Sequence, residues 1–249
     1  MKYSDARESK ETGGLRVLEI SYMGRIINPV LIWDKERVIL IDTGFPGQLP
    51  EIRSAVEAAG VPFSGLSHVV ITHQDVDHIG ALQEILKAAE HEIQVITHNE
   101  EKPFIEGVKR PLKMTKERLA AMFAHLPEEK REEASAKFLE VLKSPVNKTV
   151  EDGEVLPWCG GITVTHTPGH TPGHICLYLN QAKTLIAGDA LNVLAGQLTG
   201  PNPEFTPDME TARKSLEKLI PFEIERVVCY HGGVFEDKVK ERLLALVKG

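Results

Sequence analysis

Short apolar runs separated by turn-forming residues open the chain. They cover residues 15–21, 28–33 and 37–42, with Gly, Asn-Pro or charged residues between them. Runs of this length with such boundaries are typical of strands, so the pattern predicts a strand meander. Residues 49–60 then place apolar side chains at helical spacing and end in Gly60, which predicts a helix.

Strand and helix patterns continue to alternate along the rest of the chain. Residues 67–72, 79–90 and 93–97 follow one another as strand, helix and strand, which is a β-α-β run. The second half holds the same kinds of pattern, with strands at 161–166, 174–180, 184–189 and 226–231 and helices at 208–220 and 237–247. Because both halves contain both kinds of element, we expect an α/β fold with two sheets packed face to face and helices outside.

Residues 115–142 interrupt this alternation with two amphipathic helical patterns that break at Pro127. Apolar stripes at helical spacing usually mean packing against a core. We therefore expect a single domain over residues 1–249 with a helical insertion at about 112–143. This insertion either covers the active site or only packs its stripe on the core.

Composition narrows the classes of function. The chain has 249 residues, of which 42% are hydrophobic and 26% charged, as is ordinary for a compact protein. Its net charge of −7 comes from acidic and basic residues mixed along the sequence, so neither nucleic acid nor a membrane is an expected partner. We find no signal-peptide pattern and no apolar segment near the roughly 18 residues of a spanning helix, which predicts a cytoplasmic protein.

Two imidazoles and two carboxylates crowd into residues 73–78, between an apolar strand pattern and an apolar helix pattern. A strand-to-helix turn can aim several side chains at one point, and nitrogen and oxygen donors that converge in this way bind metal ions. The four donors are His73, Asp75, Asp77 and His78. Three other strand patterns end in further donors, within residues 165–174, 186–190 and 229–233.

The order of these motifs resembles that of the metallo-β-lactamase-fold hydrolase superfamily. Its members carry H-x-H-x-D-H after a strand, then P-G-H-T, then G-D, and a final strand that ends in His-Gly. The corresponding segments here are His73-Gln74-Asp75-Val76-Asp77-His78, Pro168-Gly169-His170-Thr171, Gly188-Asp189 and His231-Gly232. Four motifs in one order are more specific than any one of them. The resemblance covers about residues 15–249 and implies an αββα sandwich of two mixed sheets.

The resemblance also implies ligands for two divalent metal ions, for which zinc is the first expectation. The ligands are His73, Asp75 and His170 for the first ion, and Asp77, His78 and His231 for the second. Asp189 would bridge the two ions, and a hydroxide between them would be the nucleophile, because two cations lower the pKa of bound water. Catalysis would then depend on the carboxylates of Asp77 and Asp189.

Asp75 departs from the family pattern, which has a second His at this position. An aspartate oxygen lies as many bonds from the backbone as the Nδ1 atom of His, so the donor still reaches the ion. A carboxylate makes the first site harder and a weaker Lewis acid, which brings manganese or iron into consideration beside zinc. The alternative is that Asp75 leaves the first site half-formed and that only one ion binds.

Three residues near the motifs are candidates for supporting roles. Asp42-Thr43-Gly44 matches the local signature of an aspartic protease, but the chain has no second such triplet to complete a carboxylate pair. In the family that this chain resembles, the segment lies behind the metals, so Asp42 is expected to orient a ligating His. His174 either hydrogen-bonds a ligand or substrate or is structural. Asn192 stands where many lactonases of the family have a Tyr.

The resemblance implies a metal-dependent hydrolase of a small-molecule ester, lactone or related bond, in the lactonase and glyoxalase II-like branch of the family. The commonest zinc β-lactamases have Cys in place of Asp189, which argues against β-lactam hydrolysis. Two other classes stay open. A di-iron oxidoreductase would need a separate flavoprotein, and a non-catalytic metal-bound sensor would have a site closed by protein ligands, with no position left for water.

Overall fold

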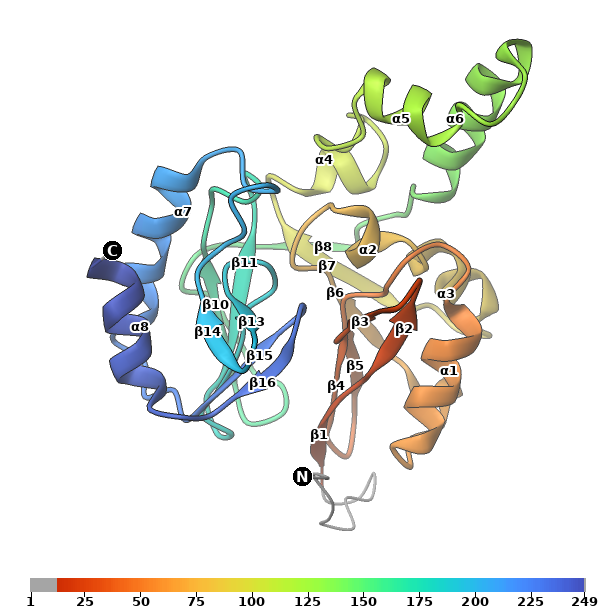
Figure 1. Cartoon of the computed structure of the whole chain (residues 1–249). Coiled ribbons are helices and arrows are strands. Elements are labelled where there is room, and N and C mark those ends of the chain that lie inside the picture. Colours follow the sequence, from red (N-terminus) through yellow and green to blue (C-terminus); the bar gives the residue numbers. More distant parts are fainter. Residues whose placement is uncertain (1–12, 249) are drawn as a thin grey trace.

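The computed structural model describes residues 13–248, which form four layers in the order helix, sheet, sheet, helix (Figure 1). The strand order of the first sheet is β1 (Gly14–Val17), β4 (Val30–Trp33), β5 (Val38–Ile41), β6 (His68–Val70), β7 (Gln94–His98), β8 (Lys148–Val150). That of the second is β16 (Gly233–Phe235), β15 (Arg226–Cys229), β12 (Thr184–Ile186), β11 (Ile175–Leu179), β10 (Ile162–His166), β9 (Val155–Leu156). Both sheets are mixed, because β5 to β8 run parallel in the first and β12 pairs parallel with β15 in the second.

The core between the two sheets is built from alternate residues of each strand. In β4, Val30 and Ile32 pack against residues of the second sheet, whereas Leu31 and Trp33 belong to the core beneath the outer helices. A strand that is buried on both faces needs apolar residues at every position. This requirement explains the continuous apolar sequences of β4 and β5, and it confirms the predicted αββα sandwich.

Helices cover the outer face of each sheet. On the first sheet lie α1 (Leu49–Ala58), the short 3₁₀ helix η1 (Phe63–Gly65) and α3 (Leu82–Ala88), with Ile52 and Ile85 fully buried. On the second lie α7 (Met209–Ser215), the 3₁₀ helix η2 (Leu216–Leu219) and α8 (Val239–Lys248), which bury Leu216 and Leu243. Burial stabilises each such side chain by about 1.5–3 kcal/mol relative to exposure. Within residues 13–248, no helix has the length and apolar content needed to cross a bilayer.

The predicted first strand at 15–21 is wrong in detail, because the structure divides it. After β1 the chain leaves the first sheet, and β2 (Ile20–Tyr22) pairs with β3 (Arg25–Ile27) in a separate hairpin. Leu18 lies at the division: its backbone N–H donates to the carbonyl of Pro29, and its carbonyl accepts from the side-chain amide of Asn28. A second hairpin, β13 (Asn192–Leu194) with β14 (Gln197–Thr199), lies in the second half.

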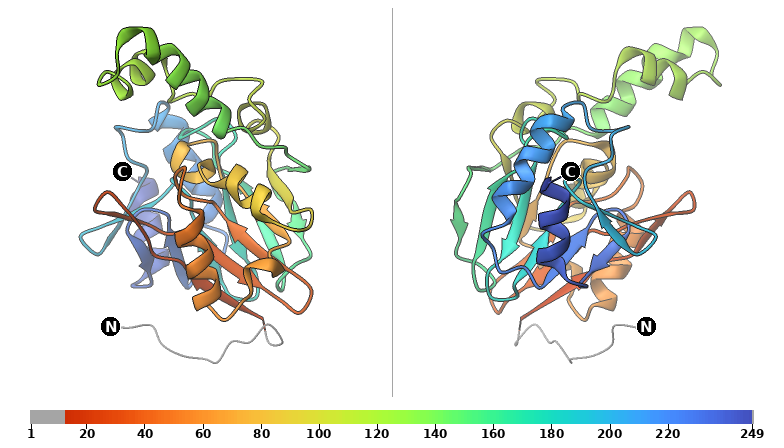
Figure 2. Two further views of the ribbon diagram at one scale, coloured as in Figure 1. Left: turned by 90° about the vertical axis from the view of Figure 1, so that its right-hand side faces the viewer. Right: turned by 60° about the vertical axis from the view of Figure 1, so that its left-hand side comes forward.

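The helical segment between the two halves rises above the sandwich. It contains α4 (Lys102–Ile105), α5 (Lys116–Met122) and α6 (Glu128–Val141), and both views of Figure 2 show α5 and α6 projecting away from the sheets. Pro127 directly precedes α6, as the sequence predicts. No residue of α6 is buried, whereas Leu119 of α5 and Met114 just before it are. Partly buried Phe138 and Leu139, near the C-terminal end of α6, pack against the core of the first half, so this end of α6 joins the segment to the body of the protein.

Candidate metal centre

The candidate ligands lie in loops that follow the carboxyl ends of strands. The first motif follows β6, Asp189 follows β12 and His231 follows β15, while His170 lies in the loop between β10 and β11. The first motif runs into α2 (Val76–Ile79), so the helix predicted at 79–90 begins earlier and is divided near Gly80. Gly80 packs against Pro46 so closely that a Cβ would lie 2.4 Å from the backbone nitrogen of Pro46. This contact fixes the helix turn that carries the motif.

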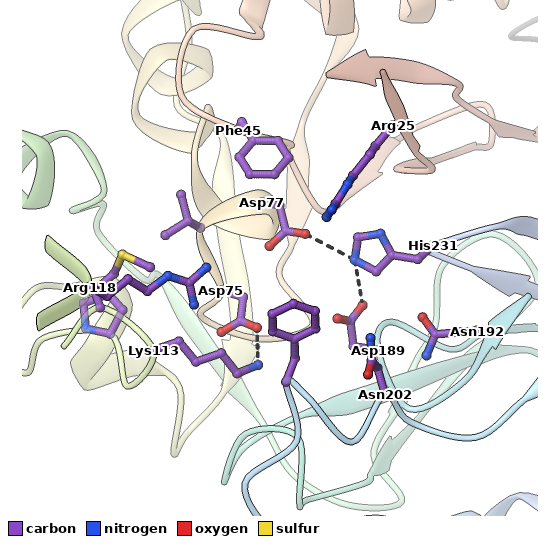
Figure 3. Close-up of a pocket in the computed structure, with 14 residues that line it drawn as sticks. Arg25, Phe45, Asp75, Asp77, Lys113, Arg118, Asp189, Asn192, Asn202 and His231 are labelled. Carbon is purple, nitrogen blue, oxygen red and sulfur yellow. Dashed lines mark hydrogen bonds and ion pairs between the residues drawn. The ribbon is translucent and has the colours of Figure 1, made fainter. Parts of the chain in front are cut away.

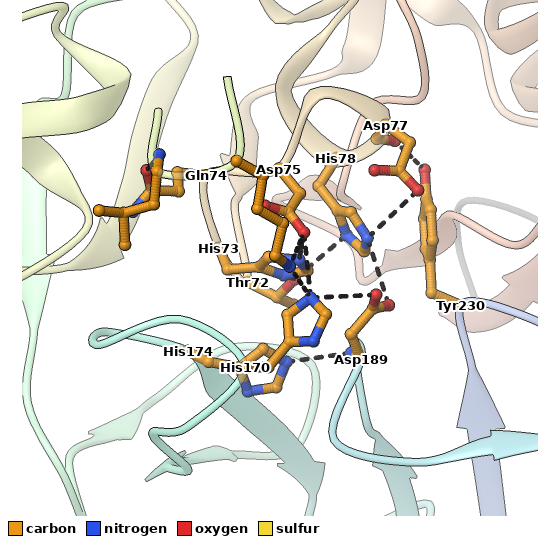
Figure 4. A network of polar contacts seen from close by, with 12 residues as sticks. Thr72, His73, Gln74, Asp75, Asp77, His78, His170, His174, Asp189 and Tyr230 are labelled. Atoms are coloured by element: carbon orange, nitrogen blue, oxygen red, sulfur yellow. Dashed lines mark hydrogen bonds and ion pairs between the residues drawn. The ribbon is translucent and has the colours of Figure 1, made fainter. Parts of the chain in front are cut away.

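The first group of ligands consists of His73, Asp75, His170 and Asp189. One ligand atom of each lies within 4.8 Å of the others. Oδ2 of Asp75 is 3.3 Å from Nε2 of His73 and 3.0 Å from Nε2 of His170 (Figure 4). Nε2 of His170 is also 3.3 Å from Oδ2 of Asp189. All four residues are buried, so the group faces inward as the sequence predicts.

The second group consists of Asp77, His78 and His231. Oδ2 of Asp77 is 3.2 Å from Nε2 of His231 and 3.8 Å from Nε2 of His78. The other oxygen of Asp189, Oδ1, faces this group, at 3.3 Å from His78 and 3.6 Å from His231. Asp189 therefore presents one oxygen to each group, which is the geometry of a bridging carboxylate.

Asp42 and Thr72 hold the rings from behind. Oδ2 of Asp42 lies 2.8 Å from Nδ1 of His78, and Oδ1 accepts from the backbone N–H of Thr72 at 2.8 Å. The Thr72 hydroxyl contacts Nδ1 of His73 at 3.0 Å. With Nδ1 engaged, each ring directs Nε2 toward the cluster, which is the usual way that a supporting residue fixes a ligating His. The structure thus places Asp42 where the sequence predicts a supporting carboxylate.

His174 and Asn192 occupy different places. His174 is fully buried behind the cluster, where its Nε2 accepts the backbone N–H of Asp189 at 3.0 Å and its Nδ1 contacts the Thr167 hydroxyl at 2.8 Å. It lies behind the ligands and fixes the backbone of Asp189. Asn192 lines the open pocket, and its amide donates to the carbonyl of Gly200.

Two buried residues that support the site, Glu101 and Tyr230, were not predicted from the sequence. The carboxylate of Glu101 accepts the backbone N–H of Gln74 at 2.9 Å and that of Gly173 at 2.7 Å, so it ties the first motif to the loop that carries His170. The hydroxyl of Tyr230 donates to the backbone carbonyl of Asp77, and its ring packs on His78 with centroids 3.8 Å apart. Glu101 sits in an otherwise polar loop, and nothing in the sequence pattern marks it.

Lys113 is the third residue that the sequence analysis misses. Its ammonium contacts Oδ2 of Asp75 and lies 2.7 Å from Nε2 of His170. Only 13% of the Lys113 side chain is exposed. Lys113 belongs to the segment interpreted from sequence as a helical insertion, where a lone lysine is usually a surface residue.

An open pocket of about 200 Å³ lies over both groups (Figure 3). Its floor contains Asp75, Asp77, Asp189 and His231. The remaining wall residues are apolar or carry amides and positive charges, and they come from both halves of the chain: Arg25, Phe45, Val76, Pro111, Lys113, Met114, Arg118, Asn192, Asn202 and Phe205. The polar cluster is thus open to a small molecule on this side.

Carboxylates control the protonation of the metal-free second group. Burial by itself lowers the pKa of His78, but the charges of Asp42, Asp77 and Asp189 outweigh it and raise this pKa well above 6.5. Burial likewise opposes the protonation of His231, yet Asp189 and Asp77 raise its pKa to about 9. A ligating imidazole is neutral, so an ion that binds here displaces these protons.

Known proteins of one family are similar to this chain. The family model described as metallo-beta-lactamase superfamily matches residues 22–231, a range that contains every candidate ligand. The probable metallo-hydrolase YflN of Bacillus subtilis is 34% identical over 208 residues, which cover 78% of this chain and 75% of YflN. The hydroxyacylglutathione hydrolase GloC of Haemophilus influenzae is 26% identical over 166 residues, or 66% of each chain.

Solved structures extend the similarity to the whole fold. The metallo-beta-lactamase family protein TTHA1429 from Thermus thermophilus has a TM-score of 0.69 at 27% sequence identity. The match covers 94% of this chain and 78% of that one.

Proposed function

Because this chain belongs to the metallo-β-lactamase superfamily, we propose that it is a dinuclear metal-dependent hydrolase of an ester, lactone or related bond in a small molecule. The observation that carries the proposal is Asp189, whose two oxygens face two separate groups of His and Asp side chains. Bound divalent ions would supply activated water and polarise the scissile bond. The chain's own residues hold the ions and shape the pocket over them.

Orphaned ligand atoms support two ion positions. Of the nine buried side-chain atoms without a hydrogen-bond partner among residues 13–248, four belong to candidate ligands: Nε2 of His73, Oδ1 of Asp75, Nε2 of His78 and Oδ1 of Asp189. Buried polar atoms nearly always have a partner. The orphans are divided between the two groups, so the donor set fits an ion in each. Imidazole and carboxylate donors without thiolate suit zinc, and also iron or manganese.

The pocket favours a substrate that carries a negative charge. The guanidinium groups of Arg25 and Arg118 both line it, and neither side chain is paired with another residue of the described chain. Guanidinium groups match the geometry of carboxylate or phosphate. Phe45 and Phe205 add apolar walls. The volume of about 200 Å³ lies below the roughly 300–1,000 Å³ of most ligand pockets, which favours a small substrate.

The proposal is tested by measuring rates of hydrolysis with protein whose metal content is known. Metal-free protein is loaded with zinc, manganese or iron, and the initial rates are measured for 4-nitrophenyl esters and small lactones. We expect metal-dependent turnover that is lost in Asp189→Asn, which keeps the shape of the side chain but removes its charge. Asp237→Asn makes the same change at an exposed carboxylate outside the pocket, so it is the matched control and should retain wild-type rates.

The two alternative classes that the sequence leaves open would give different results in the same assay. Metal binding without turnover of any ester or lactone would indicate a sensor and contradict the hydrolase proposal. Oxygen consumption by the iron-loaded protein with a reduced flavoprotein, in the absence of hydrolysis, would indicate the oxidoreductase.

A further inference from the structure

We propose that Lys113 is a resident cation of the first metal position, so that an ion enters this position only by displacing the lysine ammonium. The second position then fills first and more tightly. This inference rests on the proposed metal-dependent function. Its direct basis is the position of the Lys113 side chain. The ammonium of this side chain contacts Asp75 and His170 inside the first group of ligands.

The ammonium uses the same atoms that an ion would use. Nζ of Lys113 lies 2.7 Å from Nε2 of His170, whose lone pair is the only donor that this ring presents to the cluster. It also contacts Oδ2 of Asp75, the oxygen that faces His73 and His170. A divalent ion on these atoms would stand within contact distance of the ammonium. Charge repulsion and the lack of space make the two cations mutually exclusive.

Asp75 provides the charge that keeps the lysine in place. The family that this chain resembles has His at this position, and a neutral imidazole would not attract an ammonium as a carboxylate does. The Lys113–Asp75 pair is largely buried, with 13% and 11% of the two side chains exposed. Removal of one partner from such a pair leaves an uncompensated charge. Asp75 and Lys113 therefore form a matched pair, which links the unusual motif to the helical segment.

The backbone around Lys113 is fixed to the metal motif. The N–H of Leu112 donates to the side chain of Gln74 at 2.8 Å, and Met114 is buried against the body of the protein. The ammonium is thus held at the site by its anchored neighbours. Withdrawal requires only that the four-carbon side chain rotates toward the open pocket, which Lys113 also lines.

The second group has no such competitor. Among residues 13–248, Asp77 and Asp189 form ion pairs with His side chains only, and no Lys or Arg reaches them. An ion that binds between Asp77, His78 and His231 displaces no resident side chain. The geometry therefore points to weaker binding at the first position, because an ion must displace a side chain only there.

Zinc titration of metal-free protein by calorimetry, with metal content measured by mass spectrometry, tests this assignment. For wild type we expect one equivalent of zinc to bind tightly and a second to bind with an affinity that is roughly tenfold lower or weaker still. Lys113→Met keeps an unbranched side chain that is one atom shorter but removes its charge, and it should strengthen the weak step by roughly tenfold or more while the tight step stays unchanged. Lys116→Met is the matched control, because Lys116 is exposed three residues away and does not line the pocket.

A second readout needs no mutation. An amine-acylating reagent followed by peptide mass spectrometry should label Lys113 slowly with one equivalent of zinc and faster with two, because the second ion displaces the ammonium from the buried site. Equal affinities in wild type, or a weak step that Lys113→Met leaves unchanged, would overturn the inference. Failure of wild type to bind any ion would instead overturn the proposed function.

Discussion

The ring of His78 is held by the carboxylate of Asp42, which lies 36 positions earlier in the chain, through a contact of 2.8 Å between Nδ1 and Oδ2. Asp42 directly follows β5 and has a φ of 62°, in the left-handed region that residues with a Cβ rarely adopt. Such a conformation costs about 1–2 kcal/mol. The two hydrogen bonds from Thr72 offset this cost and aim the carboxylate at the ring.

The Asp42–His78 contact leads to a prediction about tautomers. In Asp42→Asn the amide can donate to Nδ1 of His78, which moves the ring proton to Nε2 and blocks the ligating lone pair. We expect zinc affinity at the second position to fall roughly 10- to 100-fold, as measured by calorimetry. The backbone should be undisturbed, because Asn tolerates the left-handed region. Wild-type affinity in this variant would show that Asp42 does not set the tautomer.

Glu101 is predicted to stabilise the site by joining two loops. In Glu101→Gln only one side-chain oxygen remains as an acceptor, so the N–H of either Gln74 or Gly173 loses its partner. An unsatisfied buried donor costs about 1–3 kcal/mol, which urea denaturation should detect as a lower free energy of unfolding. Glu100→Gln changes the exposed neighbour and is the control. Equal stability of the two variants would contradict the assigned role.

Sequence pattern was sufficient for the layers of the fold, whereas the set of seven candidate ligands, which the structure brings together, came from the resemblance to the family. The continuous apolar sequences of β4 and β5 predict burial on both faces, and ligands that follow strands at one edge of a sheet must converge. The metal roles of these ligands stay predictions. The single domain with a helical insertion also stays a prediction, and so does the choice between an insertion that covers the site and one that only packs on the core.

Other features depend on contacts that no local pattern records. Glu101 meets residues 27 and 72 positions away, and Lys113 meets Asp75 and His170 at 38 and 57 positions. A single Glu or Lys in a polar segment usually indicates a solvated surface. At the division of the first predicted strand, Leu18 likewise bonds to Asn28 and Pro29, which lie beyond the hairpin.

Arg25 and Arg118 are predicted to select the charge of the substrate. Once a turnover substrate is found, Arg118→Ala and Arg25→Ala should each raise KM for an analogue with a carboxylate by roughly tenfold, while a neutral isostere of the same leaving group is little affected. Arg110→Ala, which changes an exposed arginine outside the pocket, is the matched control. If KM rises by the same factor for the charged and the neutral analogue, the arginines affect the shape of the pocket and do not select charge.

His231 gives the metal-free protein a characteristic dependence on pH. Its folded pKa of about 9 exceeds the ordinary 6.5, so the protonated ring stabilises the folded state. This contribution is complete below pH 6.5 and is lost as the pH rises through 9, and the raised pKa of His78 acts in the same direction. The His231 side chain is 38% exposed, so solvent screens part of the effect.

We therefore expect the free energy of unfolding of metal-free protein, measured with urea, to decrease between about pH 6.5 and about pH 9.5. His231→Gln should reduce this decrease, because its amide does not titrate. Zinc-loaded protein should become more stable over the lower part of the same range, because fewer protons then compete with the ion for the rings. A metal-free wild type whose stability rises with pH across this interval would show that Asp77 and Asp189 do not hold His231 in its protonated form.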